Sequence, residues 1–552
     1  MLYQENVIRI LTSVLVAHGV ERVVACPGSR NAAIVNNFCE EGKVEVYPVT
    51  DERSAGFFAI GLSLATDRHP VAVCVTSGSA LLNVAPAVAE AYYRHVPLIV
   101  VSADRPQEWI DQNVGQTMRQ YGALEQYVRC SVNLLPARDD SDWYQGRLVN
   151  EAMLAANSGA RGPVHINVPL PNPSEMTMGE ADSFDRWCQP IALLEPDVCS
   201  SQVREQVILP FLTAARPMLV MGQMDLDEWM TPLLDRISER IVVISEPLTY
   251  GHARPFAGLM DSLAPSLRPD MVVYMGGSLV CRSVNTALAA TDAVVWRVDA
   301  DGDICTPFKN LHGIVKVSPE TFLKQLAEDL VAKTPEEGPS SSPADGFIQA
   351  WNQAMDSYER GNTRSVDGSR LTSETLVRYF EEQLEDMDYS YQVHVANSSI
   401  VRQACRFASG HKVWCNRGVN GIEGSVSTAV GFAAATKDMV FLLTGDLSFF
   451  YDQNALWNRH LSGNLRIILI NDHHGGIFQH VKGLEQCAHL DDVVAASHHT
   501  EARGICTQND VGYLHAATLE EMYIGVVKLL TEASARPMLL EVDMSNQKSN
   551  TF

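Results

Sequence analysis

Short runs of apolar, often β-branched residues recur along the chain, separated by longer segments with helical spacing. The clearest runs are 22–26, 71–76, 97–103, 217–222, 240–245, 271–276, 294–300, 439–445 and 466–471. They lack the strict apolar–polar alternation of a half-buried strand, and such continuous runs are typical of parallel strands covered by helices on both faces. The repeated change from strand to helix predicts an α/β protein built from doubly wound domains with mainly parallel sheets.

Breaks in this pattern divide the chain. Segment 172–200 lacks periodicity, and 332–346 is rich in Pro, Ser and charged residues, as linkers are. A chain of 552 residues also exceeds what one hydrophobic core usually organises. We therefore expect three domains at 1–180, 190–335 and 351–552, with a linker at 336–350.

A weak internal repeat relates the first and third domains. Segments 59–83 and 429–454 each contain a helix of small residues, a polar turn, an apolar strand and a polar loop, and Gly61 aligns with Gly431. Chance similarity between two ordinary strand–helix units is the alternative. We predict that the first and third domains are two versions of one fold, with a different domain between them.

Composition narrows the partners and the compartment. The formal charge of −24 disfavours nucleic acid and stable membrane association. The twelve cysteines contain no C-x-x-C pair, so we interpret them as free thiols in a reducing compartment. The first twenty residues have the pattern of a helix rather than of a signal peptide. We expect a cytoplasmic protein.

Two acidic residues follow neighbouring apolar runs directly. Asp446 comes after MVFLLTG and Asp472 comes after RIILIN, with DQNALWNRHL between them as a predicted crossover helix. In a parallel sheet these positions meet at the carboxyl edge, where ligands bind. Two carboxylates there suit a hard cation such as Mg²⁺, and glycines around them let the backbone approach a bound group. The usual dinucleotide, P-loop, serine-hydrolase and zincin motifs are missing from the sequence.

The G-D-x-S…N-D pair resembles the diphosphate-binding motif of thiamine-diphosphate enzymes. The resemblance implies that Asp446, Asp472 and the backbone carbonyl of His474 hold Mg²⁺ or Mn²⁺. It makes 1–180 the pyrimidine-binding domain, 190–335 a central α/β domain and 351–552 the diphosphate-binding domain. The cofactor-binding residues that it implies are Glu52, Ser398, Gly421, Ile422, Gly445, Asp446, Leu447, Ser448, Asp472, Gly475, Gly476 and Ile477.

Glu52 lies between a predicted strand and a helix of small residues. By itself, a glutamate at that junction could simply complement the helix dipole. In thiamine-diphosphate enzymes a glutamate on the related domain hydrogen-bonds the aminopyrimidine of the cofactor and promotes loss of the thiazolium proton. The resemblance therefore implies a catalytic role for Glu52.

Arginines recur in polar segments beside the predicted strand ends, in CPGSRNAAI, SADRPQEW, GQTMRQ, ANSSIVR and NRGVNGIEG. Most arginines on a protein are solvated, but this clustering favours a binding role. Arginine suits bidentate recognition of carboxylates, so the pattern predicts substrates with more than one carboxylate.

Together, PGSR, DER, ADRP, GQTMRQ, NSSIVR, NRGVNGIEG and GDLS resemble the 2-succinyl-5-enolpyruvyl-6-hydroxy-3-cyclohexene-1-carboxylate synthase (MenD) family, in family order across the first and third domains. Such a transferase decarboxylates 2-oxoglutarate and adds the resulting carbanion to isochorismate in menaquinone or phylloquinone biosynthesis. The family also implies a homodimer or homotetramer in which Glu52 meets the diphosphate domain of another subunit. The catalytic residues implied are Glu52, Arg30, Gln116, Ser398 and Arg402, and the substrate-binding residues are Ser29, Arg30, Arg105, Gln116, Arg282, Arg402 and Arg417.

The chain departs from the family pattern in two places. GQTMRQ is one residue tighter than the usual motif, and Arg282 precedes Ser283 where the family often has a lysine or a basic pair. The alternatives are another thiamine-diphosphate 2-oxo acid decarboxylase or an acetolactate-synthase-like carboligase, which needs fewer arginines. A catalytically silent scaffold protein is expected to have lost Glu52 or Asp446, and both are present.

Overall fold

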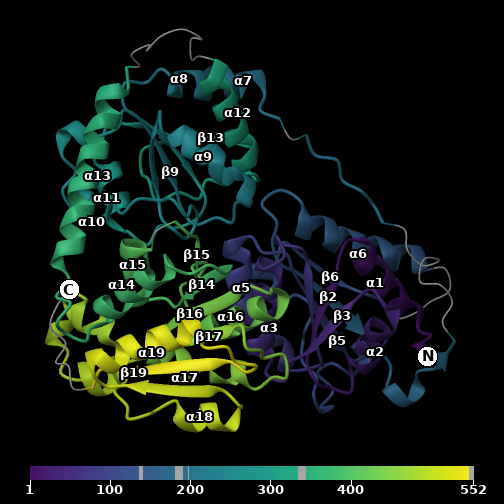
Figure 1. The fold of residues 1–552 in the computed structure, drawn as a ribbon. Helices are drawn as coiled ribbons and strands as arrows, with labels where there is room; N and C mark the ends of the chain where they lie inside the picture. The colour runs from purple at the N-terminus through teal and green to yellow at the C-terminus, as the bar shows by residue number, and fades with distance from the viewer. Residues whose placement is uncertain (136–140, 181–189, 197, 333–342, 409, 546–552) are drawn as a thin grey trace.

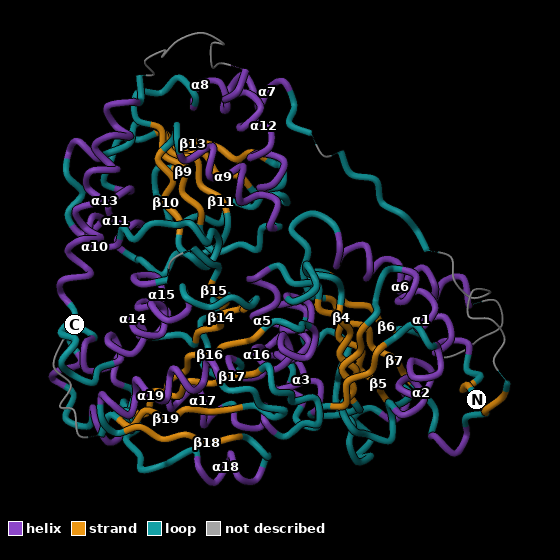
Figure 2. Tube along the Cα trace, in the orientation of Figure 1, coloured by secondary structure: helices purple, strands orange, loops and turns teal. Residues whose placement is uncertain are grey.

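The computed structural model of the protein describes residues 1–552 apart from 136–140, 181–189, 197, 333–342, 409 and 546–552. Three separate parallel sheets form the cores of three α/β units, and the central unit lies above the other two in Figure 1. This confirms the predicted α/β class with doubly wound parallel sheets. The tube in Figure 2 shows helices packed around each sheet. No helix in the described part of the chain is both long and apolar enough to span a membrane.

The first sheet has the strand order β3-β2-β4-β5-β7-β6. Its strands are β2 (Arg22–Ala25), β3 (Glu45–Pro48), β4 (Val71–Val75), β5 (Leu98–Asp104), β6 (Cys130–Asn133) and β7 (Val164–Pro169). The surrounding helices are α1 (Asn6–Ala17), α2 (Ala32–Glu41), α3 (Glu52–Leu64), α4 (Ala80–Asn83), α5 (Ala85–Arg94) and α6 (Asp142–Asn157). A small antiparallel pair, β1 (Leu2–Tyr3) with β8 (Met178–Gly179), joins the start of the chain to the end of this unit.

The third sheet has the order β15-β14-β16-β17-β19-β18, which is the same order as in the first sheet when the strands are numbered along the chain. Its strands are β14 (Tyr391–Val395), β15 (Val413–Trp414), β16 (Met439–Gly445), β17 (Leu465–Asn471), β18 (Gly512–Ala516) and β19 (Met538–Asp543). Its helices are α14 (Ser373–Leu384), α15 (Ser399–Phe407), α16 (Ser425–Ala435), α17 (Asp446–Tyr451), α18 (Arg503–Gln508) and α19 (Leu519–Thr531). The shared topology confirms that the two units are versions of one fold.

The central sheet differs, with five parallel strands in the order β10-β9-β11-β12-β13. They are β9 (Pro217–Met221), β10 (Val242–Ser245), β11 (Met271–Met275), β12 (Val294–Val298) and β13 (Leu311–Val315). The helices here are α7 (Ser201–Val203), α8 (Leu209–Phe211), α9 (Thr231–Ser238), α10 (Ala257–Asp261), α11 (Ser283–Ala289) and α12 (Pro319–Ala332).

The segment predicted to be a linker contains the start of a helix. Residues 333–342 lie outside the described residues, but α13 (Asp345–Ser365) already begins inside the predicted range 336–350. Phe347, Trp351 and Met355 of α13 are buried in the core of the central unit, and the Trp351 indole donates to the carbonyl of Leu267 at 3.0 Å. Most of α13 therefore packs with the central sheet, although the sequence pattern assigned residues 351 onward to the third domain.

The two related units pack through the helices that carry the repeat. A Cβ atom on Gly61 of α3 would lie 2.1 Å from the carbonyl oxygen of Thr428, and one on Gly431 of α16 would lie 2.1 Å from that of Phe58. The contacts are reciprocal, so α3 and α16 cross about a local two-fold axis with their backbones touching. One hydrophobic core runs through this crossing from the first unit into the third. The crossing fixes the two sheet edges relative to each other.

Candidate active site

The acidic pair lies at the carboxyl edge of the third sheet. Asp446 is the first residue of α17, directly after β16, and Asp472 directly follows β17. The two strands are parallel neighbours, with Gly445 opposite Ile470, so their ends meet. The crossover helix predicted at 452–461 is wrong: the α-helix between the two strands is α17 (Asp446–Tyr451), and a 3₁₀ turn (Gln453–Leu456) follows it.

The two carboxylates repel each other in a buried setting. Asp446 is 3% exposed, and its carboxylate accepts the backbone N–H of Leu447 at 2.6 Å. Burial raises the pKa of Asp446, and the neighbouring Asp472 raises it further. A divalent cation between the two groups would relieve this repulsion, so the residues present fit such an ion. Within the described ranges no cluster of three or more His, Cys, Asp or Glu side chains is arranged to hold a metal, and the predicted set needs only two.

The loop after Asp472 is tightly folded. The imidazole Nδ1 of His474 lies 2.7 Å from the carbonyl of Asp472, and the N–H of Gly476 donates to the carbonyl of His474 at 2.9 Å. A Cβ atom on Gly476 would lie 2.7 Å from Asp472 Oδ2, so only glycine leaves the carboxylate in place. The other predicted cofactor residues occupy the same edge, with Gly445, Leu447 and Ser448 around the start of α17 and Gly475 and Ile477 after Asp472.

A histidine that was not among the predicted site residues lies beside Asp446. His498 Nε2 lies 3.2 Å from Asp446 Oδ2, and the N–H of His498 donates to the carbonyl of His473 at 2.9 Å. A second backbone bond joins the N–H of Gly475 to the carbonyl of Ala495. Segment 490–498 therefore returns across the loop that carries Asp472. The only sequence signal for this contact was a second His-His pair in an irregular stretch.

Three of the predicted arginines gather beside this edge. Arg402 lies one helical turn after Ser398, and its guanidinium donates a hydrogen bond to the carbonyl of Ser398. The guanidinium of Arg417 donates to Asn397 Oδ1 at 3.1 Å. Arg282 comes from the central unit, at the start of α11. Burial lowers the pKa of Arg402, and the nearby charges of Arg417 and Arg282 lower it further. Such a concentration of positive charge suits an anionic ligand.

Backbone geometry shapes the same region. Ser398 has φ 79° and ψ −127°, a strained conformation for a residue with a side chain. Asn397 lies beside it and donates through Nδ2 to the carbonyls of Asn416 at 2.6 Å and Gly421 at 2.8 Å. Ile422 is half-buried just before α16. Asn397 therefore ties the turn at Ser398 to the loop that carries Arg417.

The first unit contributes a separate group of predicted residues. Glu52 begins α3 after the capping residue Asp51, is half-buried, and accepts from Asn83 Nδ2 at 3.3 Å. Gln116 is exposed, has φ 60°, and donates to the carbonyl of Ser77 at 3.2 Å. Ser29 is exposed, one residue from the buried Arg30.

Arg30 is engaged by its own domain. Its guanidinium donates to the carbonyls of Leu170 and Pro171 and to Asn172 Oδ1, at 3.2, 2.6 and 3.0 Å. Burial lowers its pKa, and the charge of Arg105 lowers it further, so the two arginines are neighbours. A substrate contact through Arg30 stays a prediction.

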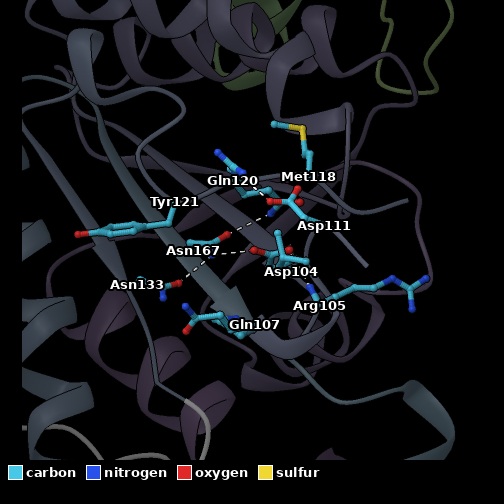
Figure 3. Close-up of a pocket in the computed structure, with 12 residues that line it drawn as sticks. Asp104, Arg105, Gln107, Asp111, Met118, Gln120, Tyr121, Asn133 and Asn167 are labelled. Carbon is cyan, nitrogen blue, oxygen red and sulfur yellow. Dashed lines mark hydrogen bonds and ion pairs between the residues drawn. The ribbon is translucent and has the colours of Figure 1, made fainter. Parts of the chain in front are cut away.

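Arg105 borders a pocket of about 340 Å³ at the carboxyl ends of β5, β6 and β7. Figure 3 shows Asn167 joined to Asp104, Asn133 and Gln120, with the guanidinium of Arg105 pointing away from this group. Gln120 also accepts the N–H of Gly78 at 2.7 Å, which ties the pocket wall to the turn beside Gln116. Of the predicted site residues, Arg105 alone lines the pocket.

In the described part of one chain, the two groups make no direct polar contact with each other. Among the described residues, no hydrogen bond or ion pair joins Ser29, Arg30, Glu52, Arg105 or Gln116 to the predicted residues of the third unit. The N-terminus of α3 instead contacts the end of α17, since Asn454 donates to Asp51 at 2.7 Å and Arg53 donates to the carbonyl of Tyr451 at 2.7 Å.

Comparison with known proteins gives consistent matches. The family described as "Thiamine pyrophosphate enzyme, N-terminal TPP binding domain" matches residues 5–123. The chain is 35% identical to the 2-succinyl-5-enolpyruvyl-6-hydroxy-3-cyclohexene-1-carboxylate synthase of Bacteroides thetaiotaomicron, over 99% of this chain and 97% of that protein. It is 36% identical to the protein of that name from Phocaeicola vulgatus, over 100% and 97%. For the one from Desulfotalea psychrophila the identity is 34%, over 96% of each chain.

Proposed function

Since this chain belongs to the 2-succinyl-5-enolpyruvyl-6-hydroxy-3-cyclohexene-1-carboxylate synthase family, we propose that it catalyses the reaction of that name. In this reaction 2-oxoglutarate loses CO₂, and the remaining four-carbon unit adds to isochorismate. Bound thiamine diphosphate supplies the electron sink for the decarboxylation. The observation that carries the proposal is the pair formed by the buried Asp446 and the half-buried Asp472 at adjoining strand ends.

The acidic edge is proposed to bind the diphosphate through a cation. Asp446, Asp472 and the carbonyl of His474 would hold Mg²⁺ or Mn²⁺. The glycines at 445, 475 and 476 give the backbone room beside it. The imidazole of His498 lies 3.2 Å from the Asp446 carboxylate. When the cation binds Asp446, this imidazole would either rotate away or stay next to the cation.

The remaining residues are proposed to act on the cofactor ring and the substrates. Glu52 would exchange a proton with the aminopyrimidine, and Ser398, Gly421 and Ile422 would line the cofactor. The cationic group of Arg282, Arg402 and Arg417 fits the carboxylates of two dicarboxylic substrates. Ser29, Arg30, Arg105 and Gln116 would complete the substrate site from the first unit.

The proposed assembly is supported by the lack of a polar contact between the two groups within one chain. Glu52 is half-buried, and among the described residues its side chain pairs with Asn83 and makes no hydrogen bond or ion pair with Asp446. We propose a homodimer or homotetramer in which Glu52 of one subunit faces the acidic edge of another. Analytical ultracentrifugation of the purified protein tests this, and a monomer that remains active would contradict it.

A component-omission assay tests the reaction. Protein, thiamine diphosphate, Mg²⁺, 2-oxoglutarate and isochorismate together should release CO₂ and consume isochorismate in equal amounts. Omitting either substrate should stop sustained turnover. Release of CO₂ from pyruvate, with no consumption of isochorismate, would support a different 2-oxo acid decarboxylase or carboligase instead.

A further inference from the structure

A buried glutamate of the first unit holds the loop that carries Arg417. Glu90 lies on α5 and is 1% exposed. Its Oε1 accepts the N–H of Gly418 and its Oε2 accepts that of Val419, both at 2.8 Å. A Cβ atom on Gly418 would lie 2.7 Å from the carbonyl oxygen of Glu90, so the loop lies directly against the helix.

A second buried glutamate holds the loop of the central unit that carries Arg282. Glu246 follows β10 and is 5% exposed. Its Oε2 accepts the N–H of Val280 and its Oε1 accepts that of Cys281, both at 2.8 Å. The next residue is Arg282. Glu90 and Glu246, from different units, thus each accept two consecutive backbone N–H groups beside an arginine. These two arginines, Arg417 and Arg282, both lie near Arg402.

A carboxylate is needed for this contact. It only accepts hydrogen bonds and has two equivalent oxygens, whereas a glutamine would direct its NH₂ group at a backbone N–H. The arginines repel one another, so their loops need fixed anchors. Arg417 is 8% exposed, and its Nε has no hydrogen-bond partner among the residues that the structure describes, which leaves this donor for a ligand.

We propose that Glu90 and Glu246 are positioning residues that hold Arg417 and Arg282 at the spacing required by dicarboxylate substrates. The proposal rests on the proposed function. It makes the first and central units determinants of substrate affinity, although neither glutamate reaches the substrate itself.

Steady-state kinetics of the holoenzyme test the proposal with Glu90→Gln and Glu246→Gln. The KM of at least one dicarboxylate should rise about tenfold or more in each variant, with a smaller change in kcat and an unchanged Kd for thiamine diphosphate. Asp329→Asn is the matched control, because Asp329 is a buried carboxylate (4% exposed) paired with Arg204, far along the chain from any predicted site residue. Its KM values should match those of the parent protein.

A double-mutant cycle separates positioning from general destabilisation. If Glu90 acts through Arg417, then adding Glu90→Gln to Arg417→Lys should raise the KM no further than Arg417→Lys does alone. The same holds for Glu246→Gln with Arg282→Gln. Additive effects in both cycles, or KM values within twofold of the parent, would overturn the proposal.

If a glutamine variant fails to fold, the aspartate variant takes its place. Aspartate keeps the negative charge but is one methylene shorter, so it should raise the KM in the same way.

Calorimetry of succinate binding to the holoenzyme compares the dicarboxylate affinity of the parent protein and the variants without turnover. The Kd should rise in both glutamine variants and stay constant in Asp329→Asn. An inactive parent protein would contradict the proposed function, whereas an unchanged succinate Kd in the variants would contradict only the role of the glutamates.

Discussion

At the scale of single residues, the site depends on where strands end. Asp446 and Asp472 could be placed from the sequence because the carboxyl ends of neighbouring parallel strands lie together, whatever the intervening chain does. His498 could not be placed in this way. It lies in an irregular segment, and only the folded structure brings it to Asp446.

Glu52→Gln should reduce turnover by at least about a thousandfold and leave the melting temperature within about 2 °C of the parent value. The substitution keeps the shape of the side chain and its contact with Asn83 but removes the carboxylate that would exchange a proton with the cofactor. Turnover and thermal unfolding, measured on the same sample, check this. Activity above about a tenth of the parent value would refute the assigned role.

Asp446→Asn should weaken binding of thiamine diphosphate in the presence of Mg²⁺ by at least about tenfold, because it removes one anionic ligand. Calorimetric titration checks the Kd. Asp438→Asn is the control, since Asp438 precedes the opposite end of the same strand, β16. A Kd shared by both variants would mean that the cation binds elsewhere.

At the scale of elements, the strands could be predicted from the sequence, but the sheet against which a given helix packs could not. Every apolar run that the sequence marked is a parallel strand. The helix α13 is an example of a helix whose partner sheet could not be predicted. Its apolar residues Phe347, Trp351 and Met355 predict a buried face, but the pattern does not say which sheet covers it, and here that sheet is the central one.

Gly61→Ala should destabilise the protein by about 3 kcal/mol or more, because the new methyl group would meet the α16 backbone where α3 crosses it. Gly146→Ala is the matched control in helix α6, where the nearest atom to the added Cβ is Ile10 Cγ2 at 3.8 Å. It should be neutral or stabilise by up to about 1 kcal/mol. Equal denaturant midpoints for the two variants would mean that the helices can move apart.

Two buried histidines should make the fold sensitive to acid. Burial lowers the pKa of His165 on β7 to about 4 and that of His394 on β14 to about 3. The unfolded chain takes up these protons near the ordinary value of 6.5, so stability should fall as the pH drops from there toward 4. His394→Gln should flatten this part of the stability curve, and an unchanged slope would contradict the assignment.

At the scale of the whole molecule, a buried ion network joins all three units. Asp225 of the central unit pairs with Arg94 of α5 at 2.8 Å and with Lys412 of the third unit at 3.0 Å. Burial alone would raise the pKa of Asp225, but the two cations lower it far below its usual value. The sequence analysis identified none of these three residues, because they lie far apart along the chain and none belongs to a recognisable motif.

Asp225→Asn should cost about 3–5 kcal/mol of stability, because it leaves the buried Arg94 and the half-buried Lys412 without their shared counter-charge. Urea unfolding checks this. The control is Asp510→Asn, which breaks the exposed pair of Asp510 and Arg536 and should leave the midpoint unchanged. A small, similar effect in both variants would mean that the units are held together by other contacts.

The most direct measurement is a crystal structure of the protein grown with thiamine diphosphate and Mn²⁺, with anomalous data at the manganese edge. The anomalous peak should lie between the carboxylates of Asp446 and Asp472, within ligand distance of the carbonyl of His474. Glu52 of the partner subunit should face the aminopyrimidine. A peak away from this pair, or a cofactor that contacts neither Asp446 nor Glu52, would contradict the account.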